Sequence, residues 1–252
     1  MSLLVFDSGI GGLGVAAQIR RLQPTQPLIY LADNGFFPYG EKPDEILLPH
    51  IVELIGVALR EFRPQAVVVA CNTASTIALP ALRAAYDVPF IGCVPPIKPA
   101  AAASTSKVIG VLATAATVRR PYLNELIRQF APGCTVLSLG TPALAELAEQ
   151  KFRGSEVDVG PAIAPLFAQA EGGRIDAIAL GCTHYTFLLP EFTALHPELA
   201  WFDPALPVAR QTLAVTGAMS STPEPVQAAY FTGTPAASAL LEPFGFSSAL
   251  PF

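Results

Sequence analysis

Charge is scarce in this chain, and positive charge is in the minority. Charged residues make up 14% of the 252 residues, and the formal net charge at pH 7 is −5. A protein without a positive excess has little general attraction for nucleic acid or anionic lipid. We therefore expect no nucleic-acid partner, and a small molecule as the ligand.

Long hydrophobic segments are missing as well. No apolar run approaches the roughly 20 residues that a membrane-spanning helix needs, although 52% of the residues are hydrophobic. The amino terminus has neither the basic start nor the following apolar stretch of a secretory signal. The sequence therefore predicts no membrane partner and a cytoplasmic location.

Cysteine is rare and dispersed. The four cysteines are Cys71, Cys93, Cys134 and Cys182, and no two of them form a CxxC pair. This spacing argues against a zinc knuckle and against a disulfide framework. Nothing near Cys93 or Cys134 suggests chemistry, so we expect both to be small core residues.

Short apolar runs alternate with helix-length segments along the chain. The runs include "LLVFD", "LIYLAD", "AVVVAC", "KVIGVLAT" and "IDAIALGC", and the longer segments include "PHIVELIGVALREF", "PYLNELIRQF" and "PAIAPLFAQAEG". This alternation is typical of parallel sheets covered by helices on both faces. The sequence predicts an α/β fold with three-layer domains and mainly parallel sheets.

A weak internal repeat suggests two related halves. "AVVVACNTAS" and "AIALGCTHYT" each place a cysteine where a strand gives way to small polar residues, 111 positions apart. Proline-rich crossings then divide the chain into a first domain of 1–94, completed by 205–252, and a second domain of 95–204. Ligands of such sheets bind beyond the carboxyl ends of the strands. We expect an active-site cleft between two pseudo-symmetric domains.

The segment "VFDSGIGGLG" contains Gly9, Gly11 and Gly14 in GxGxxG spacing after an expected strand. A dinucleotide loop is one hypothesis, since Asp33 lies about where a ribose-binding acid belongs. Asp7 argues against it, because its carboxylate would repel a pyrophosphate. A haloacid-dehalogenase-like phosphatase is disfavoured too, since Gly9 replaces its second acidic residue. The alternatives are a turn needed for close packing, and Asp7 as a helix N-cap.

Cys71 and Cys182 each end an expected strand and are followed by polar residues. Inverting an α-carbon requires a base on one face and an acid on the other, and two thiols can serve. Because a free thiol has a pKa near 8.5, a neighbour such as Asp7 or His184 must help to set its protonation. For near-attack contacts on one carbon, the two sulfurs would have to lie roughly 7 Å apart.

The three histidines differ in their surroundings. His184 follows Cys182 by two positions, which favours a catalytic role, whereas we expect His50 and His196 to be structural. No second ligand lies at helical or hairpin spacing from His184, so the sequence predicts no metal site.

Five motifs in order carry a family resemblance: "FDSGIGGLGV", "PYGEK", "ACNTAS", "GVLAT" and "LGCTHY", followed by "FDP" and "YFTGTP". With them, nearly the whole chain resembles the aspartate/glutamate racemase family, and within it the enzymes that act on glutamate. The resemblance implies interconversion of L- and D-glutamate without a cofactor or metal, supplying D-glutamate for bacterial peptidoglycan. It also implies that a homodimer can form.

The resemblance implies roles for individual residues. Cys71 would take the α-proton from D-glutamate, and Cys182 from L-glutamate. Asp7 would assist near Cys71, and His184 and Glu149 near Cys182. The residues that would hold the substrate's amino and carboxylate groups are Ser8, Tyr39, Gly40, Asn72, Thr73 and Thr183, with Thr114 and Thr117 as further contacts.

The chain departs from the family pattern at several places. "DNGFFPYG", with Gly35, Phe36 and Phe37, replaces the usual small and basic residues before "PYG". Arg120 stands where a serine is common, and Thr141 where a cysteine is frequent. An aspartate or hydantoin racemase with the same cysteine pair stays an alternative, as does a binding protein on this scaffold that acts on a partner such as a topoisomerase.

Overall fold

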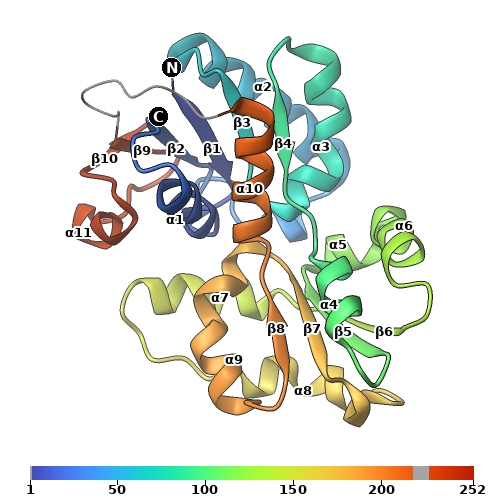
Figure 1. Ribbon diagram of the computed structural model, residues 1–252. Coiled ribbons are helices and arrows are strands. Elements are labelled where there is room, and N and C mark those ends of the chain that lie inside the picture. Colours follow the sequence, from blue (N-terminus) through green and yellow to red (C-terminus); the bar gives the residue numbers. More distant parts are fainter. Residues whose placement is uncertain (1, 218–226) are drawn as a thin grey trace. The chain divides into compact units, whose positions relative to one another are not determined.

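The computed structural model describes residues 2–217 and 227–252, and the chain divides into two compact units (Figure 1). Unit 1 consists of Met1–Cys93 and Ala205–Phe252, and unit 2 of Val94–Pro204. Each unit is built on a parallel sheet covered by helices, which confirms the predicted α/β fold class.

Unit 1 has a six-stranded sheet in the order β10-β9-β2-β1-β3-β4, and all its pairings are parallel. Its strands are β1 (Leu3–Asp7), β2 (Leu28–Ala32), β3 (Ala66–Val69), β4 (Phe90–Gly92), β9 (Gln227–Phe231) and β10 (Ser248–Pro251). The central strands β1, β2 and β3 are buried along their whole length, as apolar runs in parallel sheets require.

Helices cover both faces of this sheet. They are α1 (Gly12–Leu22), η1 (Tyr39–Glu41), α2 (Asp44–Phe62), α3 (Asn72–Ala85), α10 (Ala205–Thr216), α11 (Ser238–Leu241) and η4 (Glu242–Phe244). Alternate residues of each strand point to opposite faces. Leu4 and Phe6 of β1 therefore pack with the apolar sides of α2 and α3, and α1 packs with α10.

Unit 2 has a four-stranded parallel sheet in the order β6-β5-β7-β8. Its strands are β5 (Val108–Ala113), β6 (Thr135–Gly140), β7 (Ala177–Gly181) and β8 (Ala200–Phe202). Its helices are α4 (Ile97–Ala103), α5 (Ala115–Arg119), α6 (Pro121–Phe130), α7 (Ala143–Phe152), α8 (Gly160–Phe167), η2 (Gly172–Arg174), η3 (Thr183–Leu188) and α9 (Leu189–Leu195).

The two sheets share one strand order. Four neighbouring strands of the unit 1 sheet lie in the spatial order β2-β1-β3-β4. The strands of the unit 2 sheet lie in the order β6-β5-β7-β8. β1 therefore corresponds to β5, and β3 to β7, so the two cysteine motifs follow equivalent strands. This equivalence bears out the two related halves that the repeat predicts; β9 and β10 extend only the first sheet.

Local details differ from the sequence expectations at three places. α2 begins at Asp44 and not at the expected start, Pro49, which lies within the helix. α8 ends at Phe167, so the expected helix over "PAIAPLFAQAEG" is too long. Cys93 is fully buried as expected, whereas Cys134 is only partly buried and packs against the edge of the unit 2 core.

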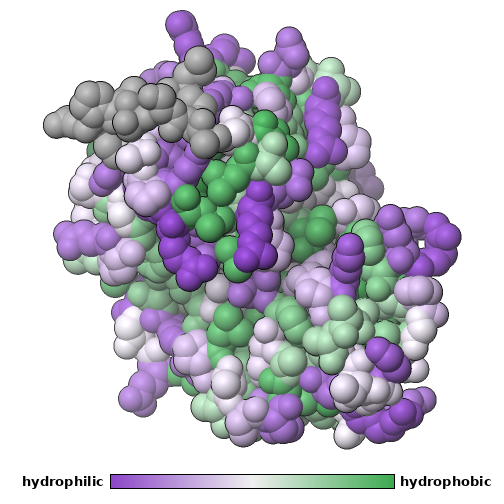
Figure 2. All heavy atoms as spheres, viewed as in Figure 1, coloured by the Kyte–Doolittle hydropathy of each residue, from purple (hydrophilic) through white to green (hydrophobic). Residues whose placement is uncertain are grey.

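Hydrophilic and hydrophobic side chains are interspersed on the face drawn in Figure 2. Most large hydrophobic residues lie in the cores of the two units, and the more exposed ones, such as Ile46 and Leu195, come from different elements. None of the helices in the described part of the chain is both long and apolar enough to cross a membrane.

Candidate active site

The glycine-rich turn after β1 folds back onto Asp7. The amide of Gly9 donates to Oδ1 of Asp7 at 3.1 Å, and the hydroxyl of Tyr30 donates to the carbonyl of Gly9 at 2.6 Å. The cap residue of α1 is Gly11, without a side-chain hydrogen bond. The alternative of Asp7 as a helix N-cap is therefore wrong; its buried carboxylate instead closes the turn.

Close packing requires glycine at Gly12, which is not one of the three glycines in GxGxxG spacing. A Cβ atom on Gly12 would lie 2.9 Å from Cβ of Asp7 and 3.0 Å from Cβ of Ala70. Real Cβ atoms do not approach so closely, so only glycine lets α1 pack directly against the ends of β1 and β3. The turn thereby fixes the backbone at Asp7 beside the strand that leads to Cys71.

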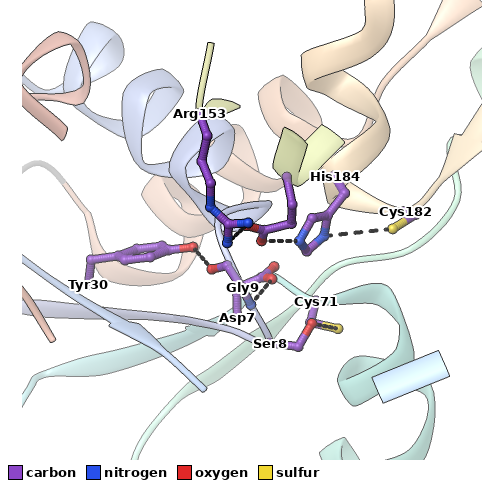
Figure 3. A network of polar contacts seen from close by, with 9 residues as sticks. Asp7, Ser8, Gly9, Tyr30, Cys71, Arg153, Cys182 and His184 are labelled. Atoms are coloured by element: carbon purple, nitrogen blue, oxygen red, sulfur yellow. Dashed lines mark hydrogen bonds and ion pairs between the residues drawn. The ribbon is translucent and has the colours of Figure 1, made fainter. Parts of the chain in front are cut away.

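Cys71 lies at the start of α3, just beyond the carboxyl end of β3. Its Sγ accepts from the amide of Ala74 at 3.5 Å and lies 3.7 Å from the hydroxyl of Ser8 (Figure 3). The side chain is buried, with 6% of the residue exposed. Amide donors at a helix start favour negative charge, so this position suits a sulfur that alternates between thiol and thiolate.

Asn72 stands next to Cys71 with an unusual side chain. It is 2% exposed, and neither its amide nitrogen nor its amide oxygen has a hydrogen-bond partner in the described structure. A buried polar group without a partner costs about 1–3 kcal/mol. A ligand with both donor and acceptor groups would recover that cost, which fits the expected contact with an amino acid. The neighbouring Thr73 is buried as well.

The "PYG" motif forms the short helix η1, where Tyr39 and Gly40 lie. The hydroxyl of Tyr39 donates to Oδ2 of Asp33 at 2.5 Å. The Asp33 carboxylate also contacts His50 and Thr232. Both of its oxygens are thus engaged within unit 1, and the alternative of Asp33 as a ribose-binding acid is wrong.

Unit 2 brings together a second group around Cys182, which follows β7 directly. Nδ1 of His184 lies 4.0 Å from Sγ of Cys182, and Nε2 lies 3.2 Å from Oε1 of Glu149 (Figure 3). Arg153 donates to the other Glu149 oxygen at 3.2 Å. The side chains of His184 and Glu149 are 3% and 11% exposed, so the pair lies in a largely water-free environment.

This arrangement assigns the protons of His184. An ionised carboxylate can only accept hydrogen bonds, so Nε2 carries a proton toward Glu149. In the neutral imidazole Nδ1 is then an acceptor, and it points toward the thiol of Cys182. The negative charge of Glu149 would also stabilise an imidazolium, if Nδ1 took up a proton. This geometry allows a proton to pass between the Cys182 thiol and Nδ1 of His184.

Three threonines of unit 2 lie at starts of helices. Thr114 caps α5: its hydroxyl accepts from the amide of Thr117 at 3.2 Å and donates to the Thr117 hydroxyl at 3.0 Å. Thr183 is buried directly after Cys182. Because β5 and β7 are neighbours, with Ala113 opposite Gly181, Thr114 and Cys182 follow adjacent strand ends. Arg120 lies between α5 and α6.

Two structural features of this half escape sequence reasoning. The hydroxyl of Tyr185 lies 3.1 Å from the carbonyl of Ala113 and 2.9 Å from that of Thr141, and so holds the ends of β5 and β6. Burial, and then the charge of Cys182, raise the pKa of Tyr185 well above its ordinary value, so it stays a donor. Arg153, the second partner of Glu149, lies at the exposed end of α7. In the sequence, only its position four residues after Glu149 indicates this contact.

The expected site residues thus form two groups, one in each unit. Unit 1 holds Asp7, Ser8, Tyr39, Gly40, Cys71, Asn72 and Thr73, and unit 2 holds Thr114, Thr117, Glu149, Cys182, Thr183 and His184. Among residues 2–217 and 227–252, no three His, Cys, Asp or Glu side chains are grouped as a metal ion would require.

Both groups lie at the carboxyl ends of parallel strands, each around a buried cysteine. A family model described as Asp/Glu/Hydantoin racemase matches residues 14–212. A glutamate racemase of Granulibacter bethesdensis is 50% identical over 225 residues, which cover 88% of this chain and 82% of that protein. One from Brucella anthropi is 46% identical over 218 residues, covering 84% of this chain and 78% of its own.

Solved structures agree with the sequence relatives. The crystal structure of Escherichia coli glutamate racemase in complex with L-glutamate and the activator UDP-MurNAc-ala has a TM-score of 0.89 and 36% identity. The match covers 99% of this chain and 97% of that one. The chain therefore belongs to the Asp/Glu/Hydantoin racemase family, and it is an isomerase.

Proposed function

We propose that this protein is a cofactor-independent glutamate racemase that works with two cysteines, Cys71 and Cys182. Sequence relatives at 50% and 46% identity are glutamate racemases. The similar Escherichia coli structure contains L-glutamate. These likenesses support glutamate as the substrate of this chain.

The observation that carries the mechanism is the equivalent position of the two cysteines. Each one follows a strand of the same rank in its sheet, β3 or β7, and each is buried with polar partners. A structural cysteine needs no such partners, since it packs as a small apolar residue. Ser8 and the start of α3 serve Cys71, and the His184–Glu149 pair serves Cys182.

In this mechanism one proton leaves and another arrives. The thiolate of Cys71 takes the α-proton of D-glutamate, and the electron pair of the broken C–H bond spreads into the neighbouring carboxylate. The thiol of Cys182 then gives its proton to the opposite face of the carbon, which yields L-glutamate. Cys71 ends as a thiol and Cys182 as a thiolate, the state that starts the reverse reaction.

Polar neighbours would tune the two sulfurs. His184 accepts the proton of Cys182 through Nδ1 while Glu149 holds the opposite ring nitrogen, which is the arrangement of an oriented general base. Asp7 plays the corresponding part near Cys71. Positioned acid–base groups of this kind contribute about 10²–10⁴-fold to a rate.

The uncharged polar residues would hold the amino acid. Its carboxylate gains negative charge as the proton leaves, and fixed hydroxyl, amide and backbone donors stabilise that charge. Asn72 supports this assignment, since its buried amide has no partner within the described structure. Ser8, Tyr39, Gly40, Thr73 and Thr183 complete the proposed contacts, with Thr114 and Thr117 beside them.

The biological role follows the same proposal. D-glutamate made by this reaction would enter bacterial peptidoglycan, and the enzyme would act in the cytoplasm, where the amino acid is available. A homodimer is part of the proposal, and sedimentation of the purified protein tests it.

Incubation of the purified protein with each enantiomer in deuterated water tests the function. Optical rotation should fall to zero from either side while the α-proton signal of glutamate disappears. Dialysis against a chelator should leave both rates unchanged. If aspartate or a hydantoin exchanged its α-proton and glutamate did not, glutamate would be the wrong substrate. If none of them exchanged, the result would favour a binding protein without racemase activity.

A further inference from the structure

A buried carboxylate in unit 1 collects three donors from distant parts of the chain. Oδ2 of Asp33 accepts from the Tyr39 hydroxyl at 2.5 Å and lies 2.6 Å from Nε2 of His50. Oδ1 accepts from the hydroxyl of Thr232 at 2.5 Å. The Asp33 side chain is 1% exposed, so these three partners replace the water that an ionised carboxylate needs.

The ring of Phe36 contacts two other rings of this cluster, the imidazole of His50 and the phenol of Tyr39. Phe36 stacks on His50, with centroids 4.2 Å apart and planes at 27°. Its edge meets Tyr39, with centroids 6.4 Å apart and planes at 74°. Phe36 belongs to the "GFF" segment in which this chain departs from its family pattern. The departure therefore creates a clamp, defined here as Phe36 and His50, on the residues that hold Tyr39.

The segment between Asp33 and Tyr39 is anchored firmly at its beginning. Asn34 bonds Thr234 and Gly233, with its Nδ2 2.7 Å from the Thr234 carbonyl and its Oδ1 2.8 Å from the Gly233 amide. Gly35 donates to the hydroxyl of Thr232 at 3.1 Å. Beyond Gly35, the clamp and the Asp33–Tyr39 bond help to orient the chain as it enters η1, together with the contact of Tyr39 with Phe6 and that of Lys42 with the Phe36 ring.

The Tyr39 side chain transmits this orientation to the proposed substrate contacts. Tyr39 is 1% exposed, and its hydroxyl donates its proton in the hydrogen bond to Asp33. Burial, and then the charge of Asp33, raise the pKa of Tyr39 well above its ordinary value, so it remains a donor. The backbone of Tyr39 and Gly40 is therefore the part of η1 that can bind a ligand. Its position depends on the position of the Tyr39 ring.

We propose that His50 and Phe36 are positioning residues for the reaction, because they hold Asp33 and Tyr39 and thereby the substrate-binding backbone of Tyr39 and Gly40. This proposal rests on the proposed function. His50 does not reach the reacting atoms in this account. It orients Asp33, which orients Tyr39.

A stability role alone would give a different pattern. The His50 side chain is 32% exposed and lies on α2, so its replacement leaves the core of unit 1 intact. Asp33 keeps Tyr39 and Thr232 as donors when His50 is lost. The main effect should then fall on substrate binding, with folding little changed.

Steady-state kinetics with both glutamate enantiomers test the clamp. Loss of one charge-assisted hydrogen bond in His50→Leu should raise KM about tenfold, with kcat within about twofold. His50→Gln keeps an amide donor for Asp33, so its KM should return to within about threefold of the original enzyme. Phe36→Ala should raise KM about fivefold, by loss of the stack. Glu53→Gln, on the exposed side of α2, is the control and should change nothing.

Histidine NMR gives a readout that does not depend on activity. The chain has three histidines, and His50→Gln identifies the His50 signals. The ring protons of His50 should move downfield in Phe36→Ala, because they lose the shielding of the stacked ring. Unchanged shifts would overturn the clamp, even in a protein that does not racemise glutamate.

The outcomes separate the two proposals. If the unaltered protein shows no exchange with glutamate, the proposed function fails, while the NMR shifts still report the clamp. If it racemises glutamate but His50→Leu keeps its KM within about twofold, the positioning role is wrong. Equal losses of melting temperature and activity in His50→Leu and His50→Gln would also overturn it, since they indicate a structural role.

Discussion

His184 and Glu149 form a buried pair, with 3.2 Å between Nε2 of the imidazole and Oε1 of the carboxylate. This contact fixes which ring nitrogen faces Cys182, because a carboxylate accepts and cannot donate. The opposite nitrogen lies 4.0 Å from the Cys182 sulfur, so it is the ring atom that could exchange a proton with the thiol.

Replacing Glu149 by glutamine should slow racemisation about 10- to 100-fold, because the imidazolium loses its stabilising charge. The two enantiomers have equal free energy, so kcat/KM must fall equally in both directions. Deuterium isotope effects should show which proton transfer is slowed. In the proposed mechanism α-deuterated L-glutamate gives its deuteron to Cys182, so the isotope effect should increase more for L-glutamate than for D-glutamate. An increase confined to D-glutamate would contradict the assignment of this pair to Cys182.

Gly12→Ala tests the close contact behind Asp7. The added Cβ would lie 2.9 Å from Cβ of Asp7, so α1 must shift away from the strand ends. Overpacking of this kind costs about 1–3 kcal/mol, and the displaced Asp7 should lower activity as well. Urea unfolding and racemisation rates measure both. Gly133→Ala is the matched control, since a Cβ there meets nothing within 4 Å, and an equal loss in the control would contradict the packing argument.

Tyr185→Phe should destabilise unit 2 by about 1 kcal/mol, because the carbonyls of Ala113 and Thr141 lose the hydroxyl donor that they share. These carbonyls lie at the ends of β5 and β6. The raised pKa of Tyr185 keeps its proton in place, so the loss should be the same from pH 6 to pH 9. Chemical unfolding at several pH values measures it, with Tyr122→Phe at an exposed ring as the control. A loss that vanishes at high pH would contradict the donor role.

Asp176 should make stability depend on pH. Burial raises its pKa, but hydrogen bonds from Ser104, Ser106 and Thr105 outweigh burial and hold the pKa well below its ordinary value. A carboxyl with a lowered folded-state pKa stabilises the fold above the unfolded pKa, about 3.9, and loses this effect as the pH falls. Asp176→Asn should therefore be less stable at pH 7, with a difference that shrinks toward pH 3.

Denaturant unfolding between pH 3 and pH 7 measures this difference. Asp87→Asn, at an exposed position, should show no comparable trend. A difference that grows as the pH falls would have the wrong sign for a carboxyl that is stabilised in its charged form.

Periodicity predicted the fold class because buried parallel strands are apolar on both faces. "LLVFD" and "AVVVAC" are apolar runs of strand length, and they form β1 and β3 in the structure. The repeat around Cys71 and Cys182 predicted the equivalence of the halves. Edge strands such as β10 carry a weaker pattern, since "SALP" is half exposed, and no signal marked it.

Within the site, sequence reasoning identified residue types and missed their contacts. A helix cap was one alternative for Asp7, but the cap position is Gly11. His50 was expected to be structural, without any partner being identified. Its partner Asp33 lies 17 positions away, and only the folded arrangement of β2 and α2 brings the two together.

The central claim is that Cys71 and Cys182 exchange protons with opposite faces of one substrate carbon, and α-hydrogen exchange in deuterated water tests it most directly. Cys71→Ala and Cys182→Ala should each lower racemisation of both enantiomers by at least about 10³-fold, because either change removes one of the two acid–base groups. Cys93→Ala, at a buried cysteine outside both groups, should racemise at nearly the original rate. Undiminished racemisation in Cys71→Ala or Cys182→Ala would contradict the account.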